Sequence, residues 1–539
     1  MSGEDLLELN DVAFRYRDRE EQAIRQISFS VEEGEVFLIA GASGCGKTTL
    51  IRTINGLIPR SYKGELSGEV LLYGENPQDW PLSKISQRVA TVLQDPERQI
   101  LGTKVLNEVA FGLENLGRPR DEIYARVDQA LKQLGILHLR ERETFNLSGG
   151  EKQKVALAGV LAMEPGILLL DEPLASLDPV SAQDTLTAVR ELADQGMTVL
   201  MVEHRVEDVL GIDPDRVLFM HDGEIRYLGD PEGLMKAVNY HEVKLPAEMI
   251  IERAKQNPPP PELDILPGVT LDDGKPESLV RFQGVDFSYE KETEVLHNIE
   301  LTIDRGDVIA VLGPNGAGKT TFVKHAIGLL EPASGDVFIE GVNTKKASVA
   351  EIAGTLGYVF QSPSHMLFAP TVYKELSFGP KNLGHSPEEI EKEVKEALEI
   401  VNLEAKEDDP PLSLSFGQQK RVSIASILAM RSRILVMDEP NAGQDYENYM
   451  NFMDSILQMP GFESILFVTH DVDLALIYAN RVILMADGSI QADGPPRDVL
   501  SDLDLLRSCN LIPTSLLTAN LERFEKLDRF QRAEALAHV

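Results

Sequence analysis

The chain has 539 residues, too many for one hydrophobic core, so we expect more than one domain. Asp and Glu number 87 against 52 for Lys and Arg, and the net charge of −35 disfavours a protein that coats nucleic acid or anionic lipid. The first residues lack the basic and apolar regions of a signal peptide, and no apolar run approaches the ~20 residues of a membrane span, which predicts that any membrane contact is made through partners.

The first candidate site is a glycine-rich loop between a predicted strand and a predicted helix. Residues 41–49 read GASGCGKTT and follow the apolar segment GEVFLIA. Such a loop closes its backbone N–H groups around phosphates at the positive end of a helix. The Lys47 amino group would then reach the β- and γ-phosphates, and the Thr48 hydroxyl would bind Mg²⁺. The predicted phosphate-binding residues are Gly41, Ser43, Gly44, Gly46, Lys47, Thr48 and Thr49.

A second candidate element is an apolar strand that ends in two carboxylates. Residues 167–173 read ILLLDEP, so Asp171 and Glu172 stand at the carboxyl end of the strand. The aspartate suits the outer shell of a Mg²⁺ ion, and the glutamate can orient or deprotonate an attacking water. An Asp-Glu pair after a strand is a weak indication alone, but its position downstream of the glycine-rich loop makes it specific.

Both elements occur twice, because the chain is a tandem repeat. Residues 313–321 read GPNGAGKTT and residues 434–440 read ILVMDEP. The offset between the copies is 272 residues at Lys47 and Lys319, and it falls to 267 residues at Asp171 and Asp438. A period of this length indicates two copies of one domain and not a solenoid. The second copy predicts a second set of site residues, namely Gly313, Asn315, Gly316, Gly318, Lys319, Thr320, Thr321, Asp438 and Glu439.

The alternation of apolar strand-sized runs with helical stretches predicts α/β domains with a mostly parallel sheet. A helix is expected over residues 387–401, with Ser386 as its N-cap, and over residues 120–134 in the first copy. Four consecutive prolines at residues 258–261 favour a stiff, extended linker. We expect a first domain over residues 1–237, the linker over 238–278, a second domain over 279–500 and a C-terminal helical extension over 501–539.

A further motif lies between the glycine-rich loop and the Asp-Glu strand. Residues 147–151 read LSGGE, and residues 414–418 of the second copy read LSFGQ. With the elements above, this motif resembles the signature of the ATP-binding cassette (ABC) family, and the resemblance covers both copies. It implies two P-loop NTPase domains in tandem, each with a parallel sheet core, an antiparallel subdomain and a helical subdomain, which bind ATP and Mg²⁺ and hydrolyse ATP.

The resemblance assigns roles to residues at matching positions. Gln94 and Gln361 match the glutamine that contacts Mg²⁺ and communicates with a membrane subunit. His204 and His470 match the histidine that contacts the γ-phosphate, so they join the two glutamates as catalytic candidates. The expected Mg²⁺ ligands are Thr48, Gln94, Asp171, Thr320, Gln361 and Asp438.

The resemblance also implies that each nucleotide site combines both copies. Tyr16 and Tyr289 match the aromatic residue that stacks on adenine. In the family, the signature helix of one domain completes the site of the other, so the two domains would pair within this one chain. The site of Lys47 would be completed by the second signature, and the site of Lys319 by the first. The signature residues expected at the nucleotides are Ser148, Gly150, Ser415 and Gly417.

The residues after each glutamine resemble the energy-coupling-factor branch of the family, which imports vitamins and transition-metal ions. From Val92 the chain reads VLQDPERQILGTKVLNEVAFGLENLG, and from Val359 it reads VFQSPSHMLFAPTVYKELSFGPKNLG. The resemblance implies a peripheral protein at the cytoplasmic face of the membrane. Its expected partners are a shared transmembrane coupling subunit and a substrate-capturing membrane protein, with no nucleic acid. Nothing in the sequence identifies the solute, which would be a vitamin, a related micronutrient or a metal ion.

Two alternatives within the family stay open. A tandem sugar-importer ATPase is the closer one, although such proteins normally carry one visibly decayed half, whereas both halves here keep lysine, glutamate and histidine. A ribosome-associated tandem ATPase usually joins its halves by a long charged helix, whereas this linker is short and contains four prolines. Two cysteines in the whole chain exclude the zinc clusters of a DNA-repair relative.

The two copies differ at two points near the expected nucleotide sites. Phe416 stands in the second signature where the first copy has Gly149, and residues 442–445 read AGQD where residues 175–178 read ASLD. A phenylalanine adds bulk where backbone must approach phosphate closely. We therefore expect the site of Lys47, which both second-copy elements would face, to hydrolyse ATP more slowly than the site of Lys319.

Overall fold

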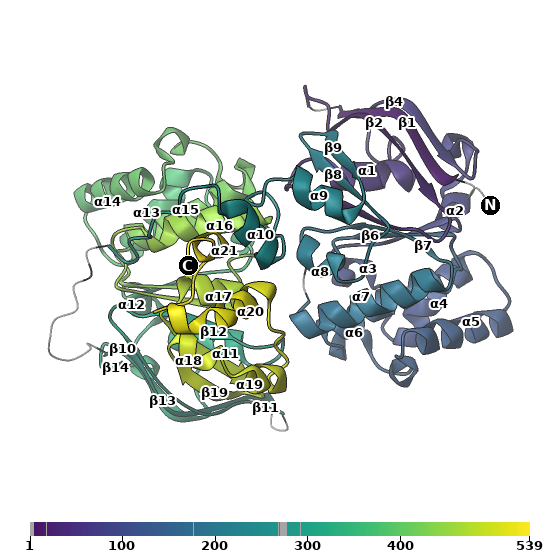
Figure 1. The fold of residues 1–539 in the computed structure, drawn as a ribbon. Coiled ribbons are helices and arrows are strands. Elements are labelled where there is room, and N and C mark those ends of the chain that lie inside the picture. The colour runs from purple at the N-terminus through teal and green to yellow at the C-terminus, as the bar shows by residue number, and fades with distance from the viewer. Residues whose placement is uncertain are drawn as a thin grey trace. The chain divides into compact units, whose positions relative to one another are not determined.

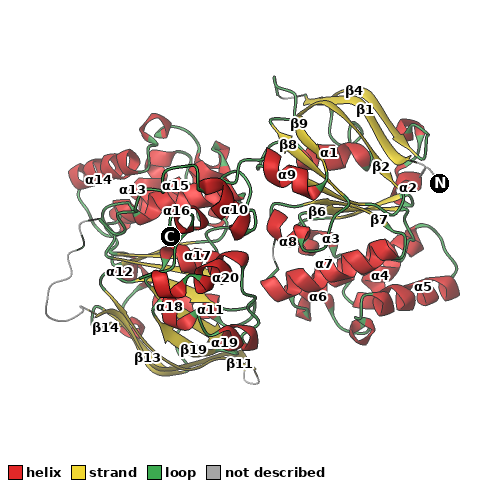
Figure 2. Ribbon diagram, viewed as in Figure 1, coloured by secondary structure: helices red, strands yellow, loops and turns green. Residues whose placement is uncertain are grey.

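The computed structural model describes residues 5–17, 19–175, 177–267, 269, 278–290, 293–442 and 444–539. The chain divides into two compact units. The first consists of Met1–Pro246 with Gly443–Glu447, and the second of Ala247–Ala442 with Asn448–Val539. Each unit contains two sheets and a set of helices (Figures 1 and 2).

The main sheet of the first unit has six strands in the order β5-β6-β7-β3-β8-β9. Neighbouring strands are parallel except for β9, which runs antiparallel to β8. Every residue of β3 and β7 is buried, which explains why these strands read as continuous apolar runs in the sequence. The strands are β3 (Val36–Gly41), β5 (Val89–Val92), β6 (Ile167–Asp171), β7 (Thr198–Val202), β8 (Arg216–His221) and β9 (Glu224–Gly229).

A second, antiparallel sheet of the first unit packs against the main one. It has the order β2-β1-β4, formed by β1 (Asp5–Tyr16), β2 (Ile24–Glu32) and β4 (Gly64–Leu72). One hydrophobic core joins the two sheets, because Phe14 of β1, Ile39 of β3 and Met220 of β8 are all fully buried in the same cluster. The end of β3, where the glycine-rich loop begins, is thus held from both sides.

The helices of the first unit surround the main sheet. Helices α4, α5 and α6 gather at the end of the unit away from β1, β2 and β4, as Figures 1 and 2 show. The helices are α1 (Lys47–Ile54), α2 (Leu82–Ser86), α3 (Pro96–Gln99), α4 (Val105–Asn115), α5 (Arg120–Gln133), α6 (Gly149–Leu161), α7 (Pro179–Asp194), α8 (Val206–Leu210) and α9 (Pro231–Ala237).

The second unit repeats this topology. Its main sheet has the order β15-β16-β17-β12-β18-β19, with only β19 antiparallel to its neighbour, and its antiparallel sheet has the order β11-β10-β13-β14. The strands are β10 (Ser278–Glu290), β11 (Thr293–Asp304), β12 (Val308–Leu312), β13 (Ser334–Ile339), β14 (Val342–Asn343), β15 (Leu356–Val359), β16 (Ile434–Asp438), β17 (Ser464–Thr469), β18 (Arg481–Ala486) and β19 (Ser489–Gly494).

The helices of the second unit include the counterparts of those in the first and a C-terminal group. Helices α13, α14 and α15 correspond to α4, α5 and α6. The helices are α10 (Ala247–Ala254), α11 (Lys319–Ala326), α12 (Val349–Ala353), α13 (Val372–Asn382), α14 (Pro387–Ile400), α15 (Phe416–Ala429), α16 (Tyr446–Leu457), α17 (Val472–Tyr478), α18 (Pro496–Val499), α19 (Leu503–Ser508), α20 (Ser515–Glu522) and α21 (Ala533–Leu536).

Helix α10 lies in the segment predicted as a linker and packs against the C-terminal helices α20 and α21. The Ala247 backbone N–H donates to the Ser515 hydroxyl over 2.9 Å, and Arg523 forms an ion pair with Glu248 at 3.1 Å. The linker helix is therefore part of the second unit. The four prolines that follow it lie in a stretch without regular secondary structure.

The fold predicted from the sequence is confirmed: two tandem α/β units, each with a mostly parallel core, an antiparallel sheet and a group of helices. The expected helix after Ser386 is also confirmed, since α14 begins with a capping box formed by Ser386 and Glu389. Among the residues that the structure describes, no helix combines the length and the apolar character needed to cross a bilayer.

Candidate functional site

The two glycine-rich loops connect a buried strand to a helix in each unit, β3 to α1 and β12 to α11. Gly44 and Gly316 have φ of +81° and +83°, a conformation that glycine adopts without strain. A Cβ at either position would meet open space, whereas a Cβ at Gly41 or Gly313 would collide with a backbone carbonyl of the neighbouring strand. The loops are therefore pressed against the sheet on one side and open on the other, as a phosphate cradle requires.

Each loop closes around the amino group of its lysine. The Lys47 Nζ donates to the carbonyls of Gly41 and Ala42 at 2.8 and 2.9 Å, and the Lys319 Nζ donates to those of Gly313 and Pro314 at 2.6 and 2.9 Å. Both lysines are the first residue of a helix that is capped by a left-handed glycine. Their ammonium groups consequently lie where the helix dipole favours an anion, and they can exchange these carbonyls for phosphate oxygens.

Oxygen atoms suited to a magnesium ion meet beside the second loop. The Thr320 hydroxyl donates to the Asp438 carboxylate over 3.1 Å, and the Tyr358 hydroxyl donates to the same oxygen over 2.9 Å. Hydroxyl and carboxylate oxygens are the ligands that Mg²⁺ prefers, so these side chains fit the ion. Burial raises the pKa of Asp438, and bound Mg²⁺ would supply the positive charge that favours its ionised form.

In the first unit, burial raises the pKa of Asp171 to about 6, and the negative charge of Glu172 adds to the shift. The positive charges of Arg52 and Lys47 oppose it. A nearby cation would stabilise the ionised form of this buried carboxyl group, so Asp171 fits the magnesium position that the sequence predicts.

The glutamate after the catalytic strand of the first unit is contacted by two predicted site residues. The Gln94 Nε2 donates to one Glu172 oxygen over 2.6 Å, and the His204 Nε2 lies 2.7 Å from the other. Burial alone would raise the pKa of Glu172, but the His204 hydrogen bond and charge, with help from Lys47, bring it below its usual value. The structure thus brings three residues, predicted from separate parts of the chain, into one cluster with an ionised carboxylate.

The second unit assembles the corresponding cluster with different contacts. The His470 Nδ1 lies 3.1 Å from one Glu439 oxygen, and the Thr469 hydroxyl donates to the other over 3.4 Å. Gln361 is exposed to solvent at the end of its strand. The histidine and the glutamate are paired in both units, but through different ring nitrogens and with different additional partners.

Both glutamates have an unusual backbone conformation. Glu172 has a φ of +49° and Glu439 a φ of +45°, in the left-handed region that residues with a side chain rarely adopt. In both cases the backbone N–H donates to a carbonyl at the end of the next strand, Val202 or Val468, over 2.9 Å. A strained conformation repeated at one position of both copies points to a functional requirement.

The two tyrosines predicted to stack on adenine are held next to the glycine-rich loops. The Tyr16 hydroxyl lies 3.1 Å from the Thr49 hydroxyl, and the Tyr289 hydroxyl lies 3.3 Å from that of Thr321. Tyr289 is exposed. Tyr16 lines an open hollow together with Arg17, Ser61, Tyr62 and Lys63. Each ring can therefore offer a face to a planar base close to the phosphate cradle.

Both signature motifs form the start of a helix. Ser148 is the N-cap of α6 and forms a capping box with Glu151, and Ser415 is the N-cap of α15 and forms one with Gln418. The exposed helix starts leave backbone N–H groups of the first turn available to an anion, with Gly150 and Gly417 in that turn.

For some of the predicted residues the structure gives few contacts or no description. Ser43 and Asn315 are exposed residues of the two glycine-rich loops. Ser176 and Gly443, which belong to the predicted difference between the copies after the catalytic strands, lie outside the described residues. Phe416 is partly exposed at the start of α15, and its ring lies 5.2 Å from the Lys420 Nζ.

Three residues near the candidate catalytic groups were not predicted from the sequence. Glu203 is fully buried and accepts backbone N–H groups of Leu174, His204 and Arg205 at 3.1, 2.8 and 3.2 Å. Tyr358 and Lys420 are the other two. Each stands at a position where the copies differ: Glu203 against Thr469, Tyr358 against Thr91, and Lys420 against Gln153. A comparison of the two copies position by position would have drawn attention to them.

Comparisons with known proteins identify the family of the chain. Residues 24–175 and 296–442 each match the ABC transporter family. A protein of Caldanaerobacter subterraneus described as an ABC transporter ATP-binding protein is 36% identical, over 95% of each chain. One of Streptococcus pneumoniae with the same description is 38% identical, again over 95% of each chain.

A third relative with that description, from Methanosarcina mazei, is 35% identical over 94% of this chain and 92% of its own. Among solved structures, cbiO1 of Clostridium perfringens, described as part of the ABC transporter complex cbiONQ, is 31% identical. It covers 47% of this chain and 100% of its own, with a TM-score of 0.40. The full-length relatives thus share the tandem arrangement over nearly the whole chain.

Proposed function

The chain belongs to the ABC transporter family, as an ATP-hydrolysing subunit with two tandem domains, and we propose that it drives an importer of the energy-coupling-factor type. The solute would be a vitamin, a related micronutrient or a metal ion, captured by a separate membrane protein. The chain would sit at the cytoplasmic face of the membrane, bound to integral membrane subunits. The sequence after Gln94 and after Gln361, which resembles that branch, supports this assignment.

In the proposed reaction, water attacks the γ-phosphorus of ATP and the bond to the β-phosphate oxygen breaks, giving ADP and phosphate. Glu172 and Glu439 would orient the water and accept its proton, while His204 and His470 hold the glutamates and contact the γ-phosphate. The lysine of each glycine-rich loop would bind the β- and γ-phosphates. Thr320 and Asp438, with their counterparts in the first unit, would hold Mg²⁺, which would neutralise negative charge on the phosphates.

One repeated surface carries the proposal that the chain couples to membrane subunits. Leu101 and Phe368 occupy the same position of the two copies, a few residues after the two glutamines, and are 69% and 63% exposed. Phe111 and Phe378, also at matching positions, are exposed on α4 and α13. Large apolar side chains exposed at the same places in both units indicate a surface that is covered by a partner.

The loop that presents these side chains is built in the same way in both units. Buried Glu108 accepts the backbone N–H groups of Leu101 and Gly102 at 2.7 and 2.6 Å. Buried Glu375 accepts those of Phe368 and Ala369 at 2.9 and 2.7 Å. In each unit a buried carboxylate fixes the backbone of this loop, and the fixed loop exposes its large apolar side chain to solvent.

The test is co-purification of the full-length chain with membrane proteins from its own cells. We expect small integral membrane proteins to be retained, and their loss when Leu101 and Phe368 are both replaced by Glu. The matched control is Val342→Glu, because Val342 is 54% exposed on β14, on the antiparallel sheet. Basal ATP hydrolysis should be unchanged in all three chains.

The co-purified proteins also discriminate between the alternatives. Ribosomal proteins in place of membrane proteins would contradict the proposal outright. Membrane subunits that bind a sugar would contradict the energy-coupling-factor assignment but not the role as a transporter ATPase. A double Glu variant that retains its partners as well as the Val342→Glu control does would contradict the proposed docking surface.

A further inference from the structure

Lys420 is a buried lysine that reaches the candidate catalytic loop of the second unit. It lies on α15, the helix that begins at the signature motif, and its side chain is 1% exposed. Its Nζ donates to the carbonyl of Pro440 over 2.5 Å. Pro440 directly follows Glu439, so the lysine connects the signature helix with the segment that carries the glutamate.

Two aromatic rings enclose this amino group. Phe416, at the start of α15, and Phe452, on α16, each have their ring centroid 5.2 Å from the Lys420 Nζ. Aromatic faces at this distance attract a cation and exclude water from it. The contact gives the unexpected phenylalanine of the second signature a structural role, because Phe416 covers the amino group on the side of the helix start.

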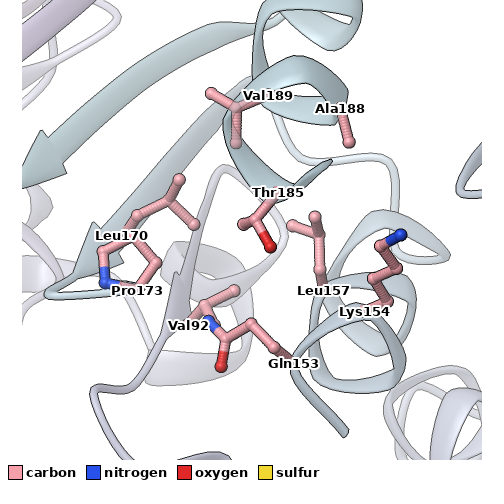
Figure 3. A pocket seen from close by; sticks show the side chains of 9 residues that line it. All are labelled: Val92, Gln153, Lys154, Leu157, Leu170, Pro173, Thr185, Ala188 and Val189. Carbon is pink, nitrogen blue, oxygen red and sulfur yellow. The ribbon is translucent and has the colours of Figure 1, made fainter. Parts of the chain in front are cut away.

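The first unit lacks all three side chains at the matching positions. Gln153 takes the place of Lys420, Thr185 that of Phe452, and Gly149 that of Phe416. A cavity of about 10 Å³, enough for one water molecule, lies there instead, lined by Gln153, Thr185 and Pro173 among others (Figure 3). In the described part of that unit, no hydrogen bond joins Gln153 to the Pro173 carbonyl.

The first unit holds the corresponding loop by another means. There the Leu174 backbone N–H, two residues after Glu172, donates to the buried Glu203 carboxylate. Glu203 stands directly before His204, so this loop is tied to the end of β7. Thr469, the counterpart of Glu203, accepts the backbone N–H of Asp471 and donates to the Glu439 carboxylate over 3.4 Å. Among the described residues, however, it accepts no backbone N–H from the loop after Glu439.

We propose that Lys420 is a positioning residue for hydrolysis in the second unit: its buried amino group holds the loop after Glu439 so that the strained glutamate keeps its orientation toward the attacking water. The proposal rests on the proposed role of Glu439 in catalysis. The left-handed φ of Glu439 is strained, and such a conformation persists only where the surrounding contacts hold it. The hydrogen bond to the next residue is such a contact.

The test compares ATP turnover of purified full-length chains. Lys420→Met keeps the length of the side chain and removes the donor, while Lys420→Arg keeps a donor. Gln153→Met is the matched control in the first unit. The variants are made in a Glu172→Gln chain, where only the second glutamate can act. If that chain has no turnover, both sites are required for every cycle, and the same variants are then measured in the otherwise wild-type chain.

We expect Lys420→Met to lower kcat by about tenfold or more, which corresponds to about 1.4 kcal/mol, with the KM for ATP within twofold of the parent. Lys420→Arg should recover a large part of kcat, and Gln153→Met should change it less than twofold. A merely structural role would instead lower the thermal stability and affect kcat and KM together.

The inference fails if Lys420→Met keeps kcat within twofold of the parent, if Arg is no better than Met, or if the Met variant loses its folding transition. Failure of the proposed function has a different outcome, namely a Glu439→Gln chain that turns over ATP at the parental rate. If Glu439→Gln abolishes ATP turnover while Lys420→Met leaves it unchanged, only the role of Lys420 is overturned.

Discussion

Replacing Lys420 by Met should stabilise the second unit near neutral pH, and the gain should shrink as the pH rises. Burial lowers the pKa of Lys420 from 10.5 to about 7, and the attraction of the Glu439 carboxylate opposes this fall. Met has a similar length and no ionisable group, so the substitution removes the titration and keeps most of the packing. Proteins keep a destabilising side chain mainly where function requires it, so a destabilising Lys420 would agree with a functional role.

The size of the effect follows from proton linkage. Between pH 7 and pH 10.5 the unfolded chain carries a proton on Lys420 that the folded chain has released. Because the unfolded state binds more protons, the free energy of unfolding of the parent rises with pH by up to ~1.4 kcal/mol per pH unit. From pH 7 to pH 9 the parent therefore gains about 2–3 kcal/mol that the Met variant does not gain.

The stability cost at pH 7 is smaller than the full pKa change implies. A fall from 10.5 to about 7 is equivalent to about 5 kcal/mol against the charged form. The hydrogen bond to the Pro440 carbonyl, which a neutral amine also donates and Met cannot, offsets about 0.5–1.5 kcal/mol of this. The Met variant should accordingly be more stable than the parent at pH 7, and more stable by a smaller margin at pH 9.

Differential scanning calorimetry of the two full-length chains at pH 7, 8 and 9 measures this. With about 2–4 °C for each kcal/mol in a domain of this size, the difference between their unfolding midpoints should change by about 5–10 °C over the range. Gln153→Met is the control, because an amide does not titrate and its difference from the parent should be independent of pH. A pH-independent difference for Lys420→Met would refute the reasoning.

Three further predictions concern the two sites and their coupling. The chain in which both Glu172 and Glu439 are replaced by Gln should bind ATP but lose about 10²–10⁴-fold in turnover, measured as phosphate release. Of the two single variants, Glu439→Gln should lose more turnover, and a larger loss from Glu172→Gln would contradict the predicted asymmetry. Glu203→Gln should lower turnover by about tenfold or more, since the amide cannot accept all three backbone N–H groups; turnover within twofold of the parent would exclude a positioning role. Glu97→Lys, which breaks the exposed ion pair with Lys152, should impair transport in reconstituted vesicles more than basal hydrolysis, and equal losses would assign the residue to the nucleotide site.

Much of the fold and of the site follows from local sequence. A few neighbouring residues determine each of these features: the glycine-rich loops, the strands before them and the capped helix starts at Ser148 and Ser386. The pairing of His204 with Glu172 could be expected because both follow adjacent parallel strands, β7 and β6, whose carboxyl ends lie at one edge of the sheet.

The contacts that could not be predicted join segments that are distant in sequence. The four prolines indicated a stiff linker, but α10 before them packs on the C-terminal helices, which only tertiary structure can show. The alignment of the copies shows Lys420 in place of Gln153, but not that its amino group reaches Pro440. Phe416 stands out in the sequence as a difference between the copies, but the sequence does not show that its ring and that of Phe452 enclose the amino group.

The two copies keep the reacting groups and differ in what holds them. A glutamate with a left-handed backbone needs its following loop fixed, and two kinds of contact can do this. The loop can give a backbone N–H to a carboxylate, as at Glu203, or accept a hydrogen bond on a backbone carbonyl, as from Lys420. The first ties the catalytic loop to the segment of the histidine, and the second ties it to the signature helix. Burial lowers the pKa of Lys420 to about 7 and raises that of Glu203, so the first contact can lose its charge by gaining a proton and the second by losing one. The two domains can therefore share one chemistry and still respond differently to their surroundings.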